Sequence, residues 1–218
     1  MPNFGPLTWI AIGYLVAAIP VGYLLGRLRG IDLRETGSGN IGATNAVRSL
    51  GKPLGVLVLL LDIAKAAVPF ALAGQDPELA ASSPAGWPPE SAHAMVGLAC
   101  VLGHIFPIYL RFRGGKGVAC ALGILGVLSW PAALAALILY AQTLVLARVS
   151  AVASLTALAT GVAVLLVQDP PWPYAVLVLV MGALIWARHR QNLRELPEKL
   201  IAAGRRRAAR DPGSEDPV

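Results

Sequence analysis

GVACALGILGVLSWPAALAALILYAQTLVLA, residues 117–147, is the longest uncharged stretch of the sequence and decides the fold. As one continuous α-helix it would measure roughly 46 Å, at about 1.5 Å per residue. The apolar core of a bilayer is about 30 Å thick, so a single crossing needs only about 20 residues. Ser129, Trp130 and Pro131 interrupt the stretch with the pattern of a turn. We therefore expect two short helices here, joined at that turn.

Five further apolar stretches are each suited to one membrane crossing. They are residues 2–26, 53–74, 91–110, 149–168 and 171–187. Hydrophobic residues make up 56% of the 218 residues, and charged residues only 14%, against about 25% in a typical soluble domain. This composition excludes a water-soluble globular enzyme and a disordered chain. The sequence therefore predicts an all-α, polytopic membrane protein with about seven transmembrane helices.

The distribution of charge supports seven crossings. With the N-terminus outside, every Lys and Arg except Lys65 falls in a cytoplasmic loop or in the C-terminal tail, while the outer loops carry acidic residues. Cytoplasmic loops of membrane proteins are enriched in Lys and Arg. Six crossings would instead place the eight basic residues of the tail outside. We expect a cytoplasmic C-terminus, one transmembrane domain at residues 1–210 and a disordered end at residues 211–218.

A polar loop, GSGNIGATNAVRSLGK at residues 37–52, follows the first span. Its glycines let the backbone turn tightly and approach a ligand closely. Arg48 carries a planar guanidinium suited to phosphate. The neutral hydrogen-bonding residues of the loop are Ser38, Asn40, Thr44 and Asn45. A flexible polar linker is the alternative, but Gly/Ser linkers seldom carry two Asn, a Thr and an Arg so close together.

A second polar element, RFRGGKG at residues 111–117, runs directly into an apolar helix. A glycine turn that opens a helix offers backbone N–H groups and the positive end of the helix dipole to an anion. We expect an anion to be bound there by Gly114, Gly115, Lys116 and Gly117. The turn is no nucleoside-triphosphate loop, because Val118 stands where a magnesium-binding Ser or Thr would be required. A tight basic turn without a ligand is the alternative.

The third element lies where the last span ends, at His189 and Asn192, which share one helix face. A histidine can act as a base, a donor or a phosphate ligand near neutral pH. An interfacial anchor is the alternative here. Asp62 and Lys65 lie inside the second span, where charges are costly unless paired. We interpret them as an internal pair, with direct chemistry as the alternative.

Two further features have open or structural interpretations. His104 lies about two helical turns outward of the glycine turn, where it either lines the same cavity or satisfies a backbone carbonyl. Gly22 and Gly26 form a Gly-x-x-x-Gly pattern, which we interpret as close helix–helix packing. The sequence shows no cluster of His, Cys, Asp or Glu with metal-ligand spacing, so no metal is expected.

All three polar elements fall on the cytoplasmic face and predict phosphorylated ligands, at least one of them with a lipid tail. An enzyme at the inner leaflet is therefore favoured. A membrane transporter of a phosphorylated metabolite is the alternative. It would require polar groups that continue through the spans to a site near the midplane, and this sequence concentrates its polarity at one face.

The three elements resemble the motifs of the bacterial acyl-phosphate:glycerol-3-phosphate acyltransferases, the PlsY family. Residues 38–51 match Ser-Gly-Asn-x-Gly-x-Thr-Asn-x-x-Arg-x-x-Gly. Residues 103–119 match Gly-His-x-x-Pro-x-[Phe/Tyr]-x-x-Phe-[Lys/Arg]-Gly-Gly-Lys-Gly-Val-Ala, and residues 189–192 match His-Arg-x-Asn. The third motif of the family usually continues to a Gly-x-Glu, and here Glu198 is the nearest acid.

The resemblance implies transfer of a fatty acyl group from acyl-phosphate to the 1-hydroxyl of sn-glycerol 3-phosphate. The products would be lysophosphatidic acid and phosphate, in the first step of phospholipid biosynthesis. It implies catalytic roles for Ser38, Arg48, Lys116, His189 and Asn192. It implies substrate binding by Asn40, Thr44, Asn45, His104, Gly114, Gly115 and Gly117. We expect a monomer among membrane lipids in the cell membrane, with no cofactor, metal or nucleic acid.

Overall fold

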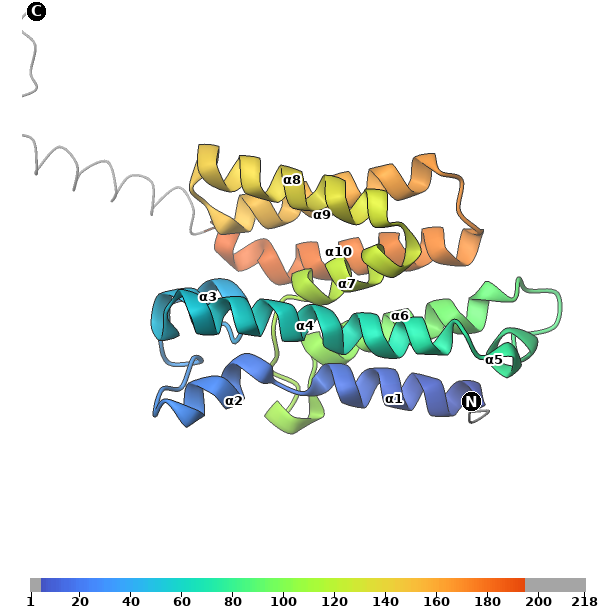
Figure 1. Ribbon diagram of the computed structural model, residues 1–218, viewed down its shortest axis with the longest axis horizontal. Helices are drawn as coiled ribbons and strands as arrows, with labels where there is room; N and C mark the ends of the chain where they lie inside the picture. Colours follow the sequence, from blue (N-terminus) through green and yellow to red (C-terminus); the bar gives the residue numbers. More distant parts are fainter. Residues whose placement is uncertain (1–4, 195–218) are drawn as a thin grey trace, which may run out of the picture.

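The computed structural model describes residues 5–194, and every regular element in that range is helical (Figure 1). The elements are α1 (Pro6–Ala18), α2 (Val21–Leu28), α3 (Ala43–Leu50), α4 (Lys52–Ala73), α5 (Pro77–Ala81), α6 (Glu90–Ile105), the 3₁₀ turn η1 (Ile108–Leu110), α7 (Val118–Leu128), α8 (Trp130–Ala147), α9 (Ser150–Val167) and α10 (Trp172–Arg194). The predicted all-α class is confirmed. Glu198 and the expected disordered end at 211–218 lie outside the described residues.

The apolar helices agree with the predicted spans, with one short member. Within residues 5–194, six segments are long and apolar enough to cross a membrane. The expected turn at Ser129 is present, and the Ser129 side chain caps α8 by accepting a hydrogen bond from the N–H of Ala132 (3.2 Å). The seventh helix, α7, has 11 residues and measures about 16 Å, roughly half of the apolar layer. The glycine turn that precedes α7 is therefore set back from the ends of the longer helices.

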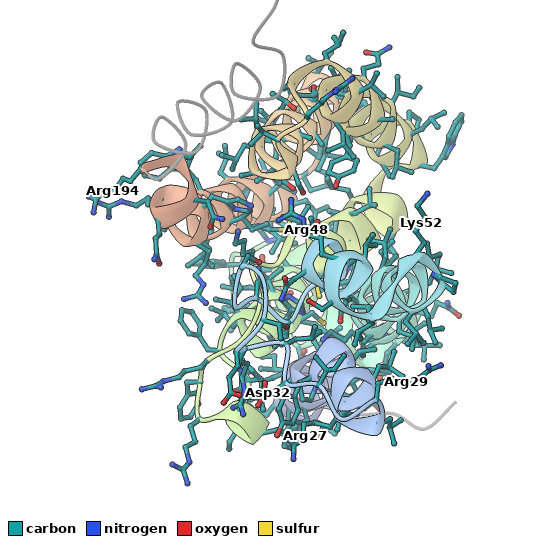
Figure 2. The ribbon with its side chains drawn as sticks, turned by 90° about the vertical axis from the view of Figure 1, so that its left-hand side faces the viewer. Arg27, Arg29, Asp32, Arg48, Lys52 and Arg194 are labelled. Atoms are coloured by element: carbon teal, nitrogen blue, oxygen red, sulfur yellow. The ribbon has the colours of Figure 1, made fainter. Side chains whose placement is uncertain are left out.

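The long helices lie side by side, and the two ends of the bundle differ in charge. Figure 1 shows the start of α1 at one end and the end of α10 at the other. The latter end, which also carries α3, is called the α3 end below. Figure 2 looks onto it, and several of the chain's basic residues lie there: Arg27, Arg29, Arg48, Lys52 and Arg194. The expected gathering of basic side chains at one face is confirmed for these residues.

The first apolar stretch is not one helix but two, because α1 ends before Pro20. A proline inside a helix has no N–H to donate and leaves a carbonyl without its partner. At this break the carbonyl of Ile19 accepts from the N–H of Val21 (3.0 Å) and from the ammonium of Lys65 of α4 (2.7 Å). The same ammonium lies 2.9 Å from the carboxylate of Asp62, and both side chains are buried. The predicted internal pair is confirmed, and it also supports the break in the first span.

Gly22 and Gly26 pack against a loop, whereas the sequence predicted that they pack against a neighbouring helix. A Cβ on Gly22 would overlap the carbonyl oxygen of Ile41, and a Cβ on Gly26 would lie 2.7 Å from that of Ile31. Both glycines therefore let α2 pack against the backbone of the α2–α3 loop. The interpretation as helix–helix packing was wrong in this respect, because the loop folds back onto its own helix.

Candidate functional site

Asn45 organises the loop between α2 and α3. Its side chain is 2% exposed. The amide nitrogen Nδ2, which has two N–H groups, lies within hydrogen-bond distance of three carbonyls, those of Leu33 (3.0 Å), Thr36 (3.0 Å) and Asn40 (2.8 Å). Its oxygen Oδ1 accepts from the N–H of Ser38 (3.0 Å). Both polar atoms of this amide therefore engage loop backbone, so Asn45 shapes the loop instead of facing a ligand.

Asn40 and Thr44 also make contacts within the protein. Oδ1 of Asn40 accepts from the N–H of Gly42 (3.1 Å), which is the geometry of an Asx turn. The hydroxyl of Thr44 lies 3.0 Å from that of Ser150 at the start of α9. The Ser150 hydroxyl also lies 3.3 Å from the hydroxyl of Tyr140 in α8. Sequence reasoning did not find Ser150 or Tyr140, because no local pattern marks them. They connect the first motif to the α8–α9 hairpin.

Arg48 and Arg34 are both exposed near this loop, but they differ in their partners. The Arg34 guanidinium hydrogen-bonds to Asp32 (2.6 Å) and lowers the pKa of that carboxyl to about 2. Arg34 also lies over the ring of Tyr23, 4.6 Å from its centroid. Arg48 has no hydrogen-bond or ion-pair partner among residues 5–194, and Figure 2 shows it near the middle of the α3 end. Arg48 is therefore a cation of this segment that is available to an anion.

The glycine turn offers a ligand a different set of backbone N–H groups from the set that the sequence predicted. The N–H of Gly114 donates to the carbonyl of Ile105 (3.2 Å), and that of Gly115 to the carbonyl of His104 (3.1 Å). These two N–H groups complete the end of α6 and do not face a ligand. Gly117 has φ = 91° and precedes α7, whose first turn has no side-chain cap. The N–H groups available to an anion are therefore those at the start of α7.

His104 lies directly beneath this turn. A Cβ on Gly115 would overlap the imidazole ring, so only glycine leaves room for the ring at that position. The other side of the ring faces the buried ion pair, with Nδ1 3.9 Å from Oδ1 of Asp62. The ring contacts the turn, as the first interpretation of His104 expected. Its Nδ1 has no hydrogen-bond partner among the described residues, so the second interpretation, a ring nitrogen that satisfies a backbone carbonyl, is not supported for that atom.

The last helix brings the second and third motifs together. The ammonium of Lys116 donates to Oδ1 of Asn192 (2.7 Å). The imidazole of His189 is 2% exposed, and its Nδ1 lies 2.8 Å from the carbonyl of Ile185. Because a carbonyl only accepts, Nδ1 carries the proton and Nε2 of the neutral ring keeps a lone pair. The site thus has one fixed ammonium and one imidazole nitrogen able to accept a proton.

Arg188 is a site residue that the sequence analysis missed. Its Nη2 donates to the carbonyl of Gly114 (3.2 Å), and its Nε to that of Gly115 (3.4 Å). It lies four residues before Asn192, hence on the same face of α10. That spacing was the available signal, but any basic residue at the end of a span also fits an interfacial anchor. Within residues 5–194, no three His, Cys, Asp or Glu side chains are grouped as a metal site requires.

The chain is similar to known membrane acyltransferases over nearly its whole length. A family model described as glycerol-3-phosphate acyltransferase matches residues 7–199. The glycerol-3-phosphate acyltransferase of Anaeromyxobacter dehalogenans (strain 2CP-C) is 48% identical, covering 86% of this chain and 91% of the relative. That of Myxococcus xanthus (strain DK1622) is 46% identical, covering 87% and 95%.

Two solved structures are similar in both sequence and fold. The crystal structure of PlsY (YgiH), an integral membrane glycerol 3-phosphate acyltransferase, in its glycerol 3-phosphate form matches with a TM-score of 0.81 and 36% identity. The match covers 89% of this chain and 92% of that one. The lysophosphatidic acid form matches with a TM-score of 0.79, 35% identity and the same coverage.

Proposed function

This chain belongs to the glycerol-3-phosphate acyltransferase family, and from that premise we propose the donor and the residues of its reaction. The protein is an integral membrane acyltransferase that acts on glycerol 3-phosphate. Its acyl donor is acyl-phosphate, and its products are lysophosphatidic acid and inorganic phosphate. The contact between Lys116 and Asn192 carries the proposal, because it joins the glycine turn to the third motif at one place.

The glycine turn receives the donor. An acyl-phosphate is a mixed anhydride and needs no covalent enzyme intermediate. The ammonium of Lys116 and the N–H groups at the start of α7 bind its phosphate, with Gly114, Gly115 and Gly117 forming the turn. These groups stabilise the negative charge that grows on the phosphate as the C–O bond to the acyl group breaks.

The loop and the last helix hold the acceptor. Arg48 binds the phosphate of glycerol 3-phosphate, and Ser38, His189 and Asn192 orient its 1-hydroxyl. The hydroxyl oxygen forms the new ester bond to the acyl carbon while phosphate leaves. The proton of the hydroxyl passes to Nε2 of His189 or to an oxygen of a substrate phosphate. Holding both substrates in attack geometry contributes about 7–11 kcal/mol.

The α3 end faces the cytoplasm in this proposal, since basic residues gather there and glycerol 3-phosphate is a cytosolic solute. The protein acts as a monomer within the cell membrane, as one domain over residues 1–210. Thiol labelling tests the orientation. The two native cysteines are buried, so a label should attach only to Lys52→Cys, at an exposed position of the α3 end. Its accessibility to the label therefore reports the orientation of that end. Labelling of Lys52→Cys from outside intact cells would contradict the assignment.

Release of phosphate by the purified protein tests the reaction. We expect release when acyl-phosphate and glycerol 3-phosphate are both present, and background rates when either is omitted. Turnover with acyl-CoA and not with acyl-phosphate would overturn the donor. We expect Lys116→Ala to impair use of acyl-phosphate and Arg48→Ala to impair use of glycerol 3-phosphate. Wild-type kinetics in both variants would overturn the assignment of these residues.

A further inference from the structure

Arg188 connects α10 to the backbone of the glycine turn. Its guanidinium donates to two consecutive carbonyls, those of Gly114 (3.2 Å) and Gly115 (3.4 Å). Its Cζ also lies 5.9 Å from the centroid of the Phe106 ring, at the end of α6. Arg188 therefore contacts the segment between α6 and α7 both where it begins and just before Lys116.

These contacts determine how two peptide groups are oriented. The C=O and N–H of a trans peptide point in opposite directions, and no cis peptide occurs among the described residues. With its C=O directed at Arg188, the Gly114–Gly115 peptide directs its N–H to the carbonyl of His104 (3.1 Å). The next peptide likewise directs its C=O at Arg188, so the N–H of Lys116 points away from that side chain. The backbone entering Lys116 is thus held from both sides.

The same face of α10 also holds the head of Lys116. Arg188 and Asn192 are four residues apart, one helical turn, and Asn192 accepts a hydrogen bond from the Lys116 ammonium (2.7 Å). We propose that Arg188 is a positioning residue that orients the glycine turn for the phosphate of the acyl donor, acting through the carbonyls of Gly114 and Gly115. The inference rests on the proposed function for the identity of that phosphate.

A lysine cannot replace this arginine. The planar guanidinium presents several N–H groups in a fixed fork, whereas an ammonium is a single compact charge on a flexible stem. Arg188→Lys therefore keeps the positive charge and loses the paired contact, and Arg188→Gln loses both. Arg194→Gln is the matched control, because Arg194 lies on the same helix and Figure 2 shows it at the edge of the α3 end.

Steady-state kinetics with each substrate varied separately test the inference. We expect Arg188→Lys and Arg188→Gln to raise KM for acyl-phosphate about tenfold or more, because hydrogen bonds from a charged group are lost. KM for glycerol 3-phosphate should stay within about twofold, and Arg194→Gln should match the wild type. An unchanged KM for acyl-phosphate in Arg188→Lys would overturn the inference, as would an equal rise in KM for both substrates.

Hydrogen–deuterium exchange gives a second readout that does not depend on activity. In Arg188→Gln, peptides covering residues 106–117 should exchange faster than in the wild type, while peptides covering residues 31–42 should not change. Arg188→Lys provides the same comparison if Arg188→Gln does not fold. Unchanged exchange over residues 106–117 in Arg188→Lys would contradict the inference. Failure of the wild type to release phosphate would instead count against the proposed function and leave this readout intact.

Discussion

The ammonium of Lys116 lies 2.7 Å from Oδ1 of Asn192, although 76 positions separate the two residues in the chain. Lys116 belongs to the glycine turn before α7, and Asn192 belongs to the last turns of α10. Their hydrogen bond joins two polar elements that are remote in sequence. It therefore places a defined positive charge where the two substrates are proposed to meet.

Asn192→Ala removes the acceptor of that hydrogen bond. A hydrogen bond to a charged group contributes about 1.5–3 kcal/mol, so we expect kcat/KM for acyl-phosphate to fall about 10- to 100-fold. A double-mutant cycle with Lys116→Met measures the coupling between the two residues. Because both substitutions remove one interaction, the double variant should lose less than the sum of the single losses. Additive losses would show that the contact has no part in catalysis.

Asn45→Ala should loosen the loop that carries Ser38. The substitution leaves carbonyls of Leu33, Thr36 and Asn40 without their donor, and each buried unsatisfied group costs about 1–3 kcal/mol. We expect a lower midpoint of thermal unfolding in detergent and a higher KM for glycerol 3-phosphate. Asn40→Ala is the comparison, because its side chain makes one hydrogen bond to this backbone. Equal effects of the two substitutions would argue against Asn45 as the organiser.

Lys65→Met tests whether the buried pair in α4 is structural. It leaves the carboxylate of Asp62 buried without its partner, and breaking such a pair costs about 3–5 kcal/mol. We expect a large fall in folded yield and in the unfolding midpoint. The double variant Asp62→Asn/Lys65→Met should recover part of both, since no lone charge remains. A stable Lys65→Met protein with reduced kcat would instead assign Lys65 to the chemistry.

Gly22→Ala should disturb the loop between α2 and α3, which is proposed to help bind glycerol 3-phosphate. Its Cβ would overlap the carbonyl oxygen of Ile41, so α2 and the loop must move apart. We expect a raised KM for glycerol 3-phosphate and reduced thermal stability. Gly182→Ala is the matched control, because a Cβ at Gly182 meets nothing within 4 Å and Ala in a helix interior should keep stability or raise it by up to about 1 kcal/mol. Similar losses in both variants would contradict the packing argument.

Much of this architecture follows from local properties of the chain. The length of each apolar stretch predicts the spans, and the turn at Ser129 is confirmed by the cap of α8. The three polar elements were also found from local patterns, because glycine spacing and residue type are typical of phosphate-binding segments, and their binding of phosphate stays a prediction. The break of the first span at Pro20 was not predicted, and neither was the contact there between the Ile19 carbonyl and Lys65, which lies 46 residues away in the chain.

The sequence by itself determined that the chain enters the membrane and which end is basic, and it predicted which segments carry the chemistry. These properties depend on hydrophobicity, charge and spacing along a single helix or loop. Only the tertiary structure decided which polar atoms remain available to a ligand. It assigned the amide of Asn45 to the loop, the N–H groups of Gly114 and Gly115 to the end of α6, and the guanidinium of Arg188 to the glycine turn. Each of these hydrogen bonds joins different elements, so its existence depends on how the helices pack.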